Sequence, residues 1–439
     1  MNWQIKSLDE VCIKITDGAH QSPKTVDSGK PMASVKDLTR FGVDLREARK
    51  ISVEDFERLV KQGCQPQVGD VLIAKDGNSA LDTVCNIKQP LEAVLLSSVA
   101  ILRPNFSVLD SDFLKFYLSS KDVVDYFKNN FISGAAIPRV VLRDFRKAQI
   151  HLPELKTQKQ IAKILGDLDD KIHLNNQINQ TLESIAQAIF KSWFIDFEPV
   201  RAKIAAKLEG ADPELAAMCA ISGKSEAELE QMAKDDFAEL QATAVLFPDE
   251  LVETELGEVP RGWSIAKVDD ILNRIKIKKR FKKNDVNEFG RTFVLEQGSN
   301  IILGFHNDEG SIPASKEEPV FIFGDHTCIT KLMLSNFDVS ENVIAVTGKE
   351  RNSYWTYYAI RDLQKFQEYR RHWMELVSKQ VVMADLNLTD YFAKKVKTLH
   401  EEIENFVHEN LVLINLRDTL LPKLLSGEVE VSDLQGEVT

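Results

Sequence analysis

The stretch IAKILGDLDDKIHLNNQINQTLESIAQAI, residues 161–189, places apolar residues at seven-residue intervals. A second such stretch, VKTLHEEIENFVHENLVLINLRDTLLPKL, covers residues 396–424 at a constant offset of 235. A single heptad pattern is also typical of an ordinary core-facing helix, but its duplication favours two long helices that pair in antiparallel orientation. The predicted seam positions are Ile161, Leu168, Asn175, Leu182 and Ile189 in the first copy, and Val396, Ile403, Asn410 and Leu424 in the second.

The seam is interrupted by a polar residue at the same place in both copies, Asn175 and Asn410, and His173 likewise matches His408. An asparagine at one seam position lowers stability but fixes the register, because it lacks a partner in any other register. We therefore expect a coiled coil with a defined register. At about 1.5 Å per residue, helices of this length would act as a rigid spacer.

Each predicted helix follows a region in which short β-branched runs, bounded by Gly and Pro, alternate with helical spacing. The two regions begin alike, since Trp3 and Leu8 match Trp263 and Val268 at an offset of 260. We predict an α+β fold with two mixed α/β domains, two long antiparallel coiled-coil helices and pseudo-two-fold internal symmetry. The predicted segments are a first domain at 1–150, a central helix at 151–197, an acidic helical spacer and return segment at 198–262, a second domain at 263–395, and a distal helix with a C-terminal tail at 396–439.

The net charge of −12 is concentrated in one part of the chain. Residues 196–258 carry 16 acidic and 5 basic side chains, a net charge of −11. Residues 1–150 carry 21 basic and 19 acidic side chains, and residues 263–395 carry 20 and 18, so each region is close to +2. The two mixed regions are therefore compatible with a polyanionic partner, despite the acidic total.

The cellular compartment is predicted from the cysteines and from the distribution of apolar residues. No apolar run reaches the length of about 18 residues that spans a bilayer, and the N-terminus lacks the basic and apolar regions of a signal peptide. The five cysteines show no close pairing. We therefore expect a cytoplasmic protein with reduced thiols and no metal site.

Three further stretches carry a resemblance to a known family. Residues 150–200 resemble the central conserved region of type I restriction–modification specificity subunits, through Pro153, Gln158 or Gln160, residues 167–172, Asn175-Asn176, Leu182-Glu183 and residues 190–197. The join LGEVPRGWSI (256–265) is similar to that family's entry into its second recognition domain, and LRDTLLPKLLSGEVEV (416–431) is similar to its distal conserved helix. The second copy departs from the first at Arg417, which occupies the seam position of Leu182.

The resemblance implies two target-recognition domains, each of which binds one half of a split sequence in double-stranded DNA. It also implies that the chain recruits two adenine-N6 methyltransferase subunits and two restriction/translocase subunits. S-adenosylmethionine, ATP and Mg would then be bound by these partners, and no cofactor is expected on this chain. We expect Trp193, Phe194 and Phe197 to contribute to contacts with the partners.

No catalytic motif is evident. The chain lacks an Asn/Asp-Pro-Pro-aromatic run and a G-x-x-x-x-G-K-[ST] phosphate loop. We therefore expect a non-catalytic subunit. Two alternatives remain open, an enzyme with unfamiliar motifs and a cytoplasmic coiled-coil adaptor that binds proteins rather than DNA.

Three segments of the first domain are candidates for contact with DNA, because sequence readout needs short polar side chains at base edges and amides or cations at phosphates. Two of them are turn-rich loops, of which the second resembles the family's Arg/Lys-x-Gly loop. An ordinary Asp-Gly turn explains the first loop equally well. The candidate residues are Thr16, Asp17, Gly18, His20 and Gln21; Lys75, Asp76, Gly77 and Asn78; and Ser133, Gly134 and Arg139.

The second domain has matching segments and one strongly basic stretch. Asp325, His326 and Thr327 follow a predicted strand and resemble a Gly-Asp-His-Thr loop of the same family. In the basic stretch, Arg274, Lys276 and Lys278 alternate with isoleucines, which predicts a strand with its charges on one face and favours phosphate contact over a merely solvated surface. The remaining candidates are Lys279, Arg280 and Lys282 of that stretch, and Arg370, Arg371 and His372 before the second long helix, where solvation of a helix surface is an equally good explanation.

Overall fold

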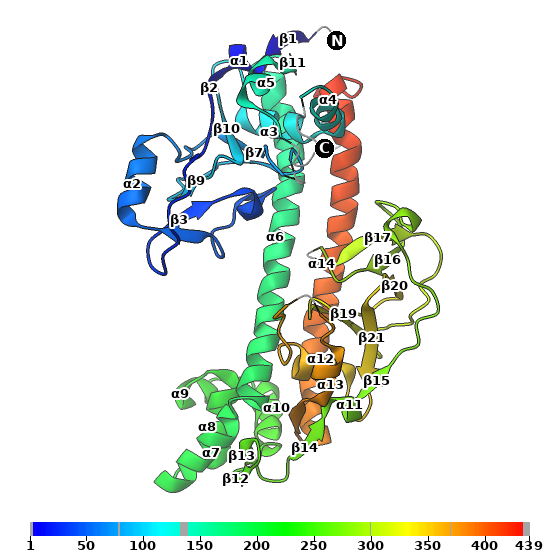
Figure 1. The fold of residues 1–439 in the computed structure, drawn as a ribbon. Coiled ribbons are helices and arrows are strands. Elements are labelled where there is room, and N and C mark those ends of the chain that lie inside the picture. Colours follow the sequence, from blue (N-terminus) through cyan, green and yellow to red (C-terminus); the bar gives the residue numbers. More distant parts are fainter. Residues whose placement is uncertain (1–2, 78–79, 132–138, 299, 369, 433–439) are drawn as a thin grey trace. The chain divides into compact units, whose positions relative to one another are not determined.

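The structure is a computed structural model that describes residues 3–77, 80–131, 139–298, 300–368 and 370–432 (Figure 1). It consists of two compact units. Unit 1 comprises residues 1–174 and 410–439, and unit 2 comprises residues 175–409. Among the described residues, no helix combines the length and the apolar character needed to cross a membrane.

Unit 1 is built on a four-stranded antiparallel sheet in the order β2-β10-β7-β8. A smaller sheet has the order β6-β3-β9, with β3 and β9 parallel, and β1 pairs with β11. The strands are β1 (Gln4–Ser7), β2 (Cys12–Asp17), β3 (Lys30–Ala33), β4 (Leu38–Thr39), β5 (Gly42–Val43), β6 (Arg49–Ile51), β7 (Val71–Ala74), β8 (Val84–Asn86), β9 (Val94–Leu95), β10 (Val99–Pro104) and β11 (Gln149–Leu152), and the helices are α1 (Leu8–Val11), α2 (Val53–Lys61), α3 (Ser111–Ser119), α4 (Lys121–Phe131) and α5 (Leu142–Lys147).

Unit 2 contains a second sheet with the order β15-β21-β18-β19, again antiparallel throughout. Its smaller sheet is β17-β16-β20, with β16 and β20 parallel, and β14 pairs with β22. The strands are β14 (Ser264–Lys267), β15 (Leu272–Arg274), β16 (Thr292–Leu295), β17 (Ile302–His306), β18 (Val320–Gly324), β19 (Thr330–Met333), β20 (Phe337–Val339), β21 (Val343–Gly348) and β22 (Gln380–Met383), and the helices are α11 (Val268–Ile271), α12 (Ser353–Ile360) and α13 (Trp373–Ser378).

The two units therefore share one topology, as the sequence repeat predicts. In each unit the strand that precedes the long helix, β11 or β22, pairs with an earlier strand, β1 or β14; the central sheet has the same connectivity, and the smaller sheet contains one parallel pair. The central strands β7 and β18 are buried along their whole length, which explains why they read as continuous apolar runs rather than as alternating patterns.

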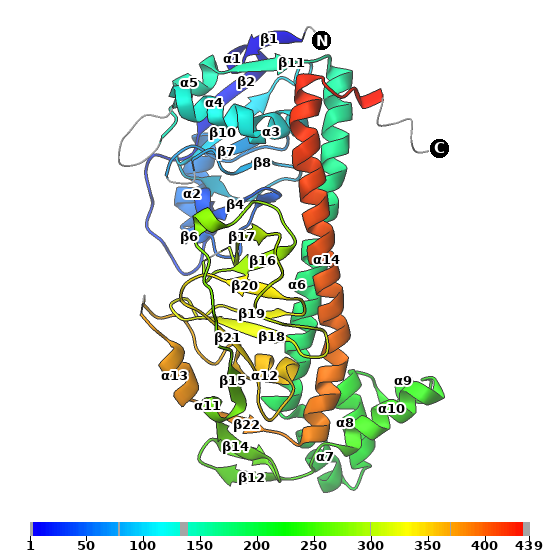
Figure 2. The ribbon, with the colours of Figure 1, turned by 90° about the vertical axis from the view of Figure 1, so that its right-hand side faces the viewer.

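One helix covers the central sheet in each unit. In unit 1 this is α3, which begins where the Asp110 carboxylate accepts a hydrogen bond from the Phe113 amide. In unit 2 it is α12, where Asn352 caps the helix through the Tyr354 amide. Aromatic side chains of α12 contact β18 on one side and the long helices on the other, so α12 lies between the sheet and those helices (Figure 2).

Two long helices, α6 (Leu155–Phe194) and α14 (Leu386–Ser426), run without interruption through the division between the units. In unit 1, Ile161 of α6 shares a core with Leu424 of α14. In unit 2, Phe190 of α6 packs on Phe392 of α14, with ring centroids 5.5 Å apart. Residue numbers rise along one helix as they fall along the other, so the helices pack in antiparallel orientation within each unit.

The predicted seam positions are all buried or half-buried. Asn175 and Asn410 are both buried, and Asn175 Nδ2 donates to a Glu409 carboxylate oxygen at 2.8 Å. The matched histidines each contact an aromatic ring of their own unit, His173 on Phe41 and His408 on Phe293. The distal helix begins at Leu386 rather than near Val396, because an apolar face that includes Leu388 and Phe392 extends it into the core of unit 2.

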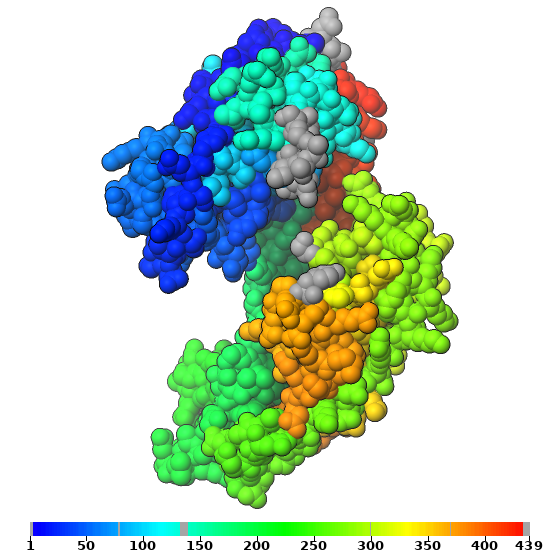
Figure 3. Space-filling model, in the orientation of Figure 1, coloured from blue at the N-terminus to red at the C-terminus, as the bar shows by residue number. Residues whose placement is uncertain are grey.

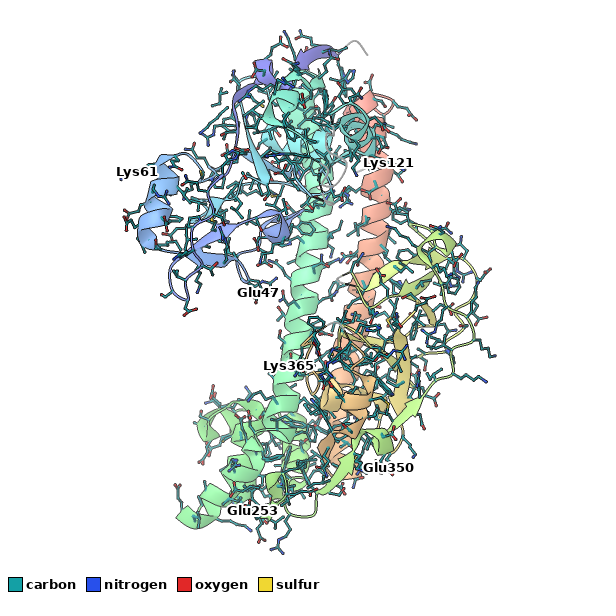
Figure 4. The ribbon with its side chains drawn as sticks, viewed as in Figure 1. Glu47, Lys61, Lys121, Glu253, Glu350 and Lys365 are labelled. Carbon is teal, nitrogen blue, oxygen red and sulfur yellow. The ribbon has the colours of Figure 1, made fainter. Side chains whose placement is uncertain are left out.

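The acidic spacer after α6 forms four helices and a hairpin within unit 2. A small core that includes Ala217 and Leu229 holds the helices together, and Lys203 is buried with its ammonium group donating to the Phe247 carbonyl. The side chain of Glu253 lies on the hairpin that follows (Figure 4). The elements are α7 (Glu198–Glu209), α8 (Pro213–Ser222), α9 (Glu226–Leu229), α10 (Lys234–Val245), β12 (Leu251–Thr254) and β13 (Gly257–Pro260).

Trp193, Phe194 and Phe197 lie inside unit 2, which corrects their prediction as partner contacts. Each is less than a tenth exposed. Phe194 packs on Phe392 of α14 and on Trp263, which lies just before β14. These rings therefore fasten α6 to its own unit and are not available on its surface.

One buried carboxylate organises the core of unit 1. Asp169 of α6 is 2% exposed and accepts hydrogen bonds from three cations on separate elements. Arg40 Nε, from the turn between β4 and β5, lies 3.0 Å from it, Lys115 Nζ of α3 lies at 2.7 Å and an Arg417 terminal nitrogen of α14 lies at 2.8 Å. Arg417, the departure from the repeat, is thus the contact that links α14 to α6 at this level.

The charges of this cluster depend on one another. Burial works against ionisation of Asp169, yet the adjacent Arg40, Lys115 and Arg417 outweigh it and lower the pKa of the carboxyl group. Burial also lowers the pKa of Lys115, because desolvation of the ammonium group exceeds the attraction of Asp169. Asp169 is therefore the anion that makes burial of these cations tolerable.

We predict that Asp169→Ala lowers the free energy of unfolding by about 3–5 kcal/mol, because it leaves buried cations without their counter-charge. The matched control is Asp170→Ala, which removes the neighbouring carboxylate from an exposed pair with Lys88 and should cost less than about 1 kcal/mol. Urea denaturation of the full chain, followed by far-ultraviolet circular dichroism, measures both. Equal losses would show that the cluster stabilises no more than a surface ion pair.

Unit 2 uses neutral groups at its own contact between α12 and α14. The Tyr358 hydroxyl and His400 Nε2 are 2.8 Å apart and both side chains are buried. Burial lowers the pKa of His400 to about 4, against the attraction of Glu183. A histidine with a lowered pKa takes up its proton more readily in the unfolded chain, so stability is lost as the pH falls below its unfolded pKa.

We predict that the free energy of unfolding falls by up to about 3 kcal/mol between pH 7 and pH 4 on account of His400. His400→Asn should flatten this part of the pH profile, whereas His408→Asn, at a more exposed position on the same helix, should leave it in place. Urea midpoints measured across that range give the slope. A profile that is unchanged by His400→Asn would contradict the assignment.

Candidate nucleic-acid interface

The first two candidate loops of unit 1 converge on a buried lysine. Lys75 directly follows β7 and is 1% exposed. Its Nζ lies 3.4 Å from the Asp17 carboxylate, at the end of β2, and 3.2 Å from that of Asp76. An ammonium group enclosed by two carboxylates holds the two loops together, so Lys75 acts inside the protein rather than at its surface.

The loop after β2 is shaped by a close backbone approach at Gly18. A Cβ atom there would lie 2.1 Å from the Leu95 carbonyl oxygen, so no larger residue fits. Thr16 pairs with Ile101 in the central sheet. The exposed members of the loop are His20, whose Nε2 lies 3.1 Å from Asp17, and Gln21, which accepts a hydrogen bond from Arg58 of α2.

The third candidate segment of unit 1 joins this group through Arg139. Its Nε lies 3.1 Å from an Asp76 carboxylate oxygen, and the two residues form an isolated antiparallel bridge. The next residue, Val140, donates its amide to the Lys75 carbonyl at 2.9 Å. Gly77 has a φ of +96°, which favours glycine, while Asn78, Ser133 and Gly134 lie outside the described residues.

Unit 2 brings its corresponding segments together around Asp325, which follows β18. The buried Asp325 carboxylate accepts hydrogen bonds from the His372 and Trp373 amides, at 3.1 and 3.0 Å, and so caps α13. Its other oxygen lies 3.8 Å from Arg371 Nε. The segment that includes α13 is coloured orange on the near surface in the space-filling view (Figure 3).

The remaining candidates of unit 2 differ in exposure. His372 is completely buried and its ring contacts Gln364 and Glu375. Arg370 forms ion pairs with Glu368 and Glu375 on the protein itself. Arg371 is 77% exposed and is the candidate of this segment best placed to meet a ligand. The loop between α12 and α13 also carries the exposed Lys365 (Figure 4).

His326 and Thr327 occupy a tight turn beside the second loop. The His326 amide donates to the Gln297 side chain at 2.8 Å, and both residues are half-buried. Cys328 has a φ of +59°, which closes the turn. The sequence did not single out Gln297 or Arg58, whose contacts with the candidate loops join segments far apart in the chain.

The sites of the two units are equivalent in backbone bonding. Lys75 donates its amide to Ser98 and accepts from the Val140 amide, while Asp325 donates to Asn342 and accepts from the His372 amide. Arg139 and Arg371 precede these equivalent acceptor contacts. Each unit therefore presents an arginine at the same place, beside the loop that follows the same central strand.

The basic stretch departs from the prediction in one respect. Strand β15 ends at Arg274, although the Ile275 amide still donates to the Ala345 carbonyl. The partner strand runs out at Val343, whose carbonyl accepts a hydrogen bond from Arg280 at 2.9 Å, so the predicted strand does not continue to Lys278.

The alternation of exposure nevertheless persists through this stretch. The side chains of Arg274, Lys276 and Lys278 are exposed while the intervening isoleucines are half-buried. Lys279 lies over the ring of Phe281 at 4.1 Å, and Lys282 is exposed. A row of cations without an intervening acid thus remains on the surface of unit 2. Among the described residues, no cluster of histidines, cysteines and carboxylates has the make-up of a metal site.

Comparison with known proteins identifies relatives that match about three quarters of the chain. A family model described as the type I restriction modification DNA specificity domain matches residues 1–184. The chain is 31% identical over 379 residues to the type I restriction enzyme HindI specificity subunit of Haemophilus influenzae, with 76% of this chain and 81% of that protein covered. It is 24% identical over 348 residues to the MjaIX specificity subunit of Methanocaldococcus jannaschii, with 74% and 70% covered. Among solved structures, the S subunit of a type I restriction–modification system from M. genitalium has a TM-score of 0.49 and 14% identity, with 97% and 96% covered.

If the cationic row binds phosphates, we expect Lys276→Gln with Lys278→Gln to weaken binding to every DNA sequence. The slope of log affinity against log salt should become less steep by about one for each lysine. The matched control is Lys224→Gln with Lys234→Gln, two exposed lysines of the acidic spacer. Fluorescence anisotropy across a salt series measures both. Weakening confined to one sequence would assign these lysines to base recognition instead.

Proposed function

The chain belongs to the family of type I restriction enzyme specificity subunits, and we propose that each of its two units reads one half of a split DNA target. The observation that carries this proposal is the shared topology of the units combined with different side chains at the equivalent loops. Lys75 with Asp17 and Asp76 occupies the place in unit 1 that Asp325 occupies in unit 2. Two units that share their strand connectivity but differ in their loop residues are suited to recognise two different half-sequences.

Burial and charge indicate which residues of each unit would contact bases, which would contact phosphates and which would support the loops. Exposed residues beside the strand-end loops, among them His20, Gln21 and Arg371, are the candidates for contact with bases. Lys276 and Lys278, exposed side chains of a stretch without acidic residues, are the candidates for contact with phosphates. Lys75, Asp325 and His372 are buried, and their role is to hold the loops in shape.

We further propose that α6 and α14 set the number of base pairs between the two half-sequences. Both helices are uninterrupted between the units, and their buried polar residues, Asn175 with Glu409 and Asp169 with Arg417, oppose slippage of the register. A helix of fixed register is a suitable spacer, because each residue adds about 1.5 Å along its axis.

Methyl transfer and DNA cleavage are assigned in this proposal to partner subunits. The chain would act without a cofactor of its own, and two methyltransferase and two restriction/translocase subunits would supply S-adenosylmethionine, ATP and Mg chemistry. The five cysteines are unpaired thiols, which supports a reducing compartment such as the cytoplasm. A protein-binding adaptor is the alternative, and it predicts no sequence-selective binding of DNA.

The test is to map N6-methyladenine in DNA from cells that carry this chain and its cognate partners. We expect a split motif with a constant gap. Insertion of seven residues after Leu174 and of seven after Glu409 should lengthen the gap by about three base pairs, since each helix gains about 10 Å. The half-sequences themselves should stay the same.

The matched control inserts seven residues after Gly210, within the spacer and outside both long helices, and should leave the gap unchanged. Methylation without a split motif, or methylation that does not depend on this chain, would favour the adaptor. A gap that ignores the paired insertions would overturn the role of the helices.

A further inference from the structure

Each of the two equivalent arginines has a carboxylate beside its Nε atom. Arg139 Nε lies 3.1 Å from Asp76, and Arg371 Nε lies 3.8 Å from Asp325. The two carboxylates are held by the fold, since Asp76 also contacts the buried Lys75 and Asp325 caps α13. Each guanidinium group therefore lies beside a carboxylate that cannot move away freely.

Orientation through Nε determines what the side chain is suited to bind. The edge of a guanidinium group that bears the two terminal nitrogens matches the paired acceptors O6 and N7 of guanine in the major groove. In Arg371, whose side chain is 77% exposed, Nε approaches the Asp325 carboxylate at an ion-pair distance of 3.8 Å. Arg139 is half-exposed and uses the same atom on its own carboxylate.

The adjacent carboxylates also discriminate between a base and a phosphate. A phosphate that approached Arg139 or Arg371 would meet the negative charge of Asp76 or Asp325 a few ångströms behind the guanidinium group. A guanine edge carries partial charges only and meets much less repulsion. Lys276 and Lys278 have no such carboxylate in their stretch, which suits them to phosphates.

We propose that Arg139 and Arg371 each recognise a guanine, one in each half of the split target, and that Asp76 and Asp325 are the positioning residues. Because the arginines occupy equivalent places in two units of one topology, the two guanines occupy equivalent places in the two half-sequences. The inference rests on the proposed function, since it needs DNA to lie across both loops.

The experiment uses the full chain assembled with its methyltransferase partner. The wild-type motif is first determined, and competition binding then compares it with a set of duplexes in which each base pair is changed in turn. Arg139→Lys and Arg371→Lys keep the charge but remove the guanidinium edge with its two terminal nitrogens. Each should lose roughly 5- to 150-fold of discrimination at one G·C pair, in a different half for each variant, and leave the other positions unchanged.

Asp76→Asn and Asp325→Asn should reduce discrimination at the same two pairs, because they remove the charge that orients each arginine. An asparagine in place of Asp325 can still cap α13 through its amide oxygen, so loss of folding does not obscure the result. The controls are Arg143→Lys and Arg261→Lys, which are exposed arginines of units 1 and 2 that lie next to Asp144 and Glu250 instead.

Three results would overturn the inference. One is a motif that lacks a G·C pair in either half, another is a uniform loss of affinity across all duplexes, and the third is an effect of the variants no larger than that of the controls. Failure of the proposed function itself is seen separately and earlier, as a wild-type protein that prefers no split motif.

Discussion

The fold depends on the packing of α6 against α14, because each unit builds its core on both helices. In unit 1, apolar residues of the two helices join the core beneath α3, and in unit 2 they join the aromatic core beneath α12. The helices that cover the central sheets, α3 and α12, pack in turn against this pair. The polar contacts of the pair, at Asp169 and at Asn175, then decide which residues stand opposite one another.

The two units attach the helices that cover their sheets, α3 and α12, to the long helices through different chemical groups. Unit 1 joins α3 to the long helices through a buried carboxylate and three cations, whereas unit 2 joins α12 to them through tyrosine, phenylalanine and a neutral histidine. Duplicated units tolerate this divergence, since Asp169 in one and the Tyr358–His400 pair in the other find their polar partners within their own unit. The surface loops differ even more between the two units, although the strands that carry them are connected in the same way.

Local and repeated features of the fold could be predicted from the sequence. Heptad spacing located the long helices, and continuous apolar runs located β7 and β18. Contacts between distant segments could not, because nothing local marks Arg40 as the partner of Asp169, 129 residues away, or Arg417 as another, 248 residues away.

The candidate site shows the same limit. A run of cations or of aromatic residues looks the same in the sequence whether its side chains face solvent or the core. His372 and Lys75 proved to be buried, although each belongs to a polar stretch, and Trp193 of the aromatic stretch is buried as well. Strand β15 ends at Arg274, opposite Val346, although its partner strand β21 extends to Val343, so the alternation of the basic stretch did not mark where the strand ends.

Unit 2 is continuous in the chain and interrupts unit 1, which contains residues from both sides of it. This nesting imposes an order on folding during translation. Leu421 and Leu424, which complete the core around Ile161 and Leu165, leave the ribosome after every residue of unit 2. The N-terminal part of unit 1 therefore keeps an apolar face exposed to solvent until the C-terminal half of α14 has been synthesised and packs on it.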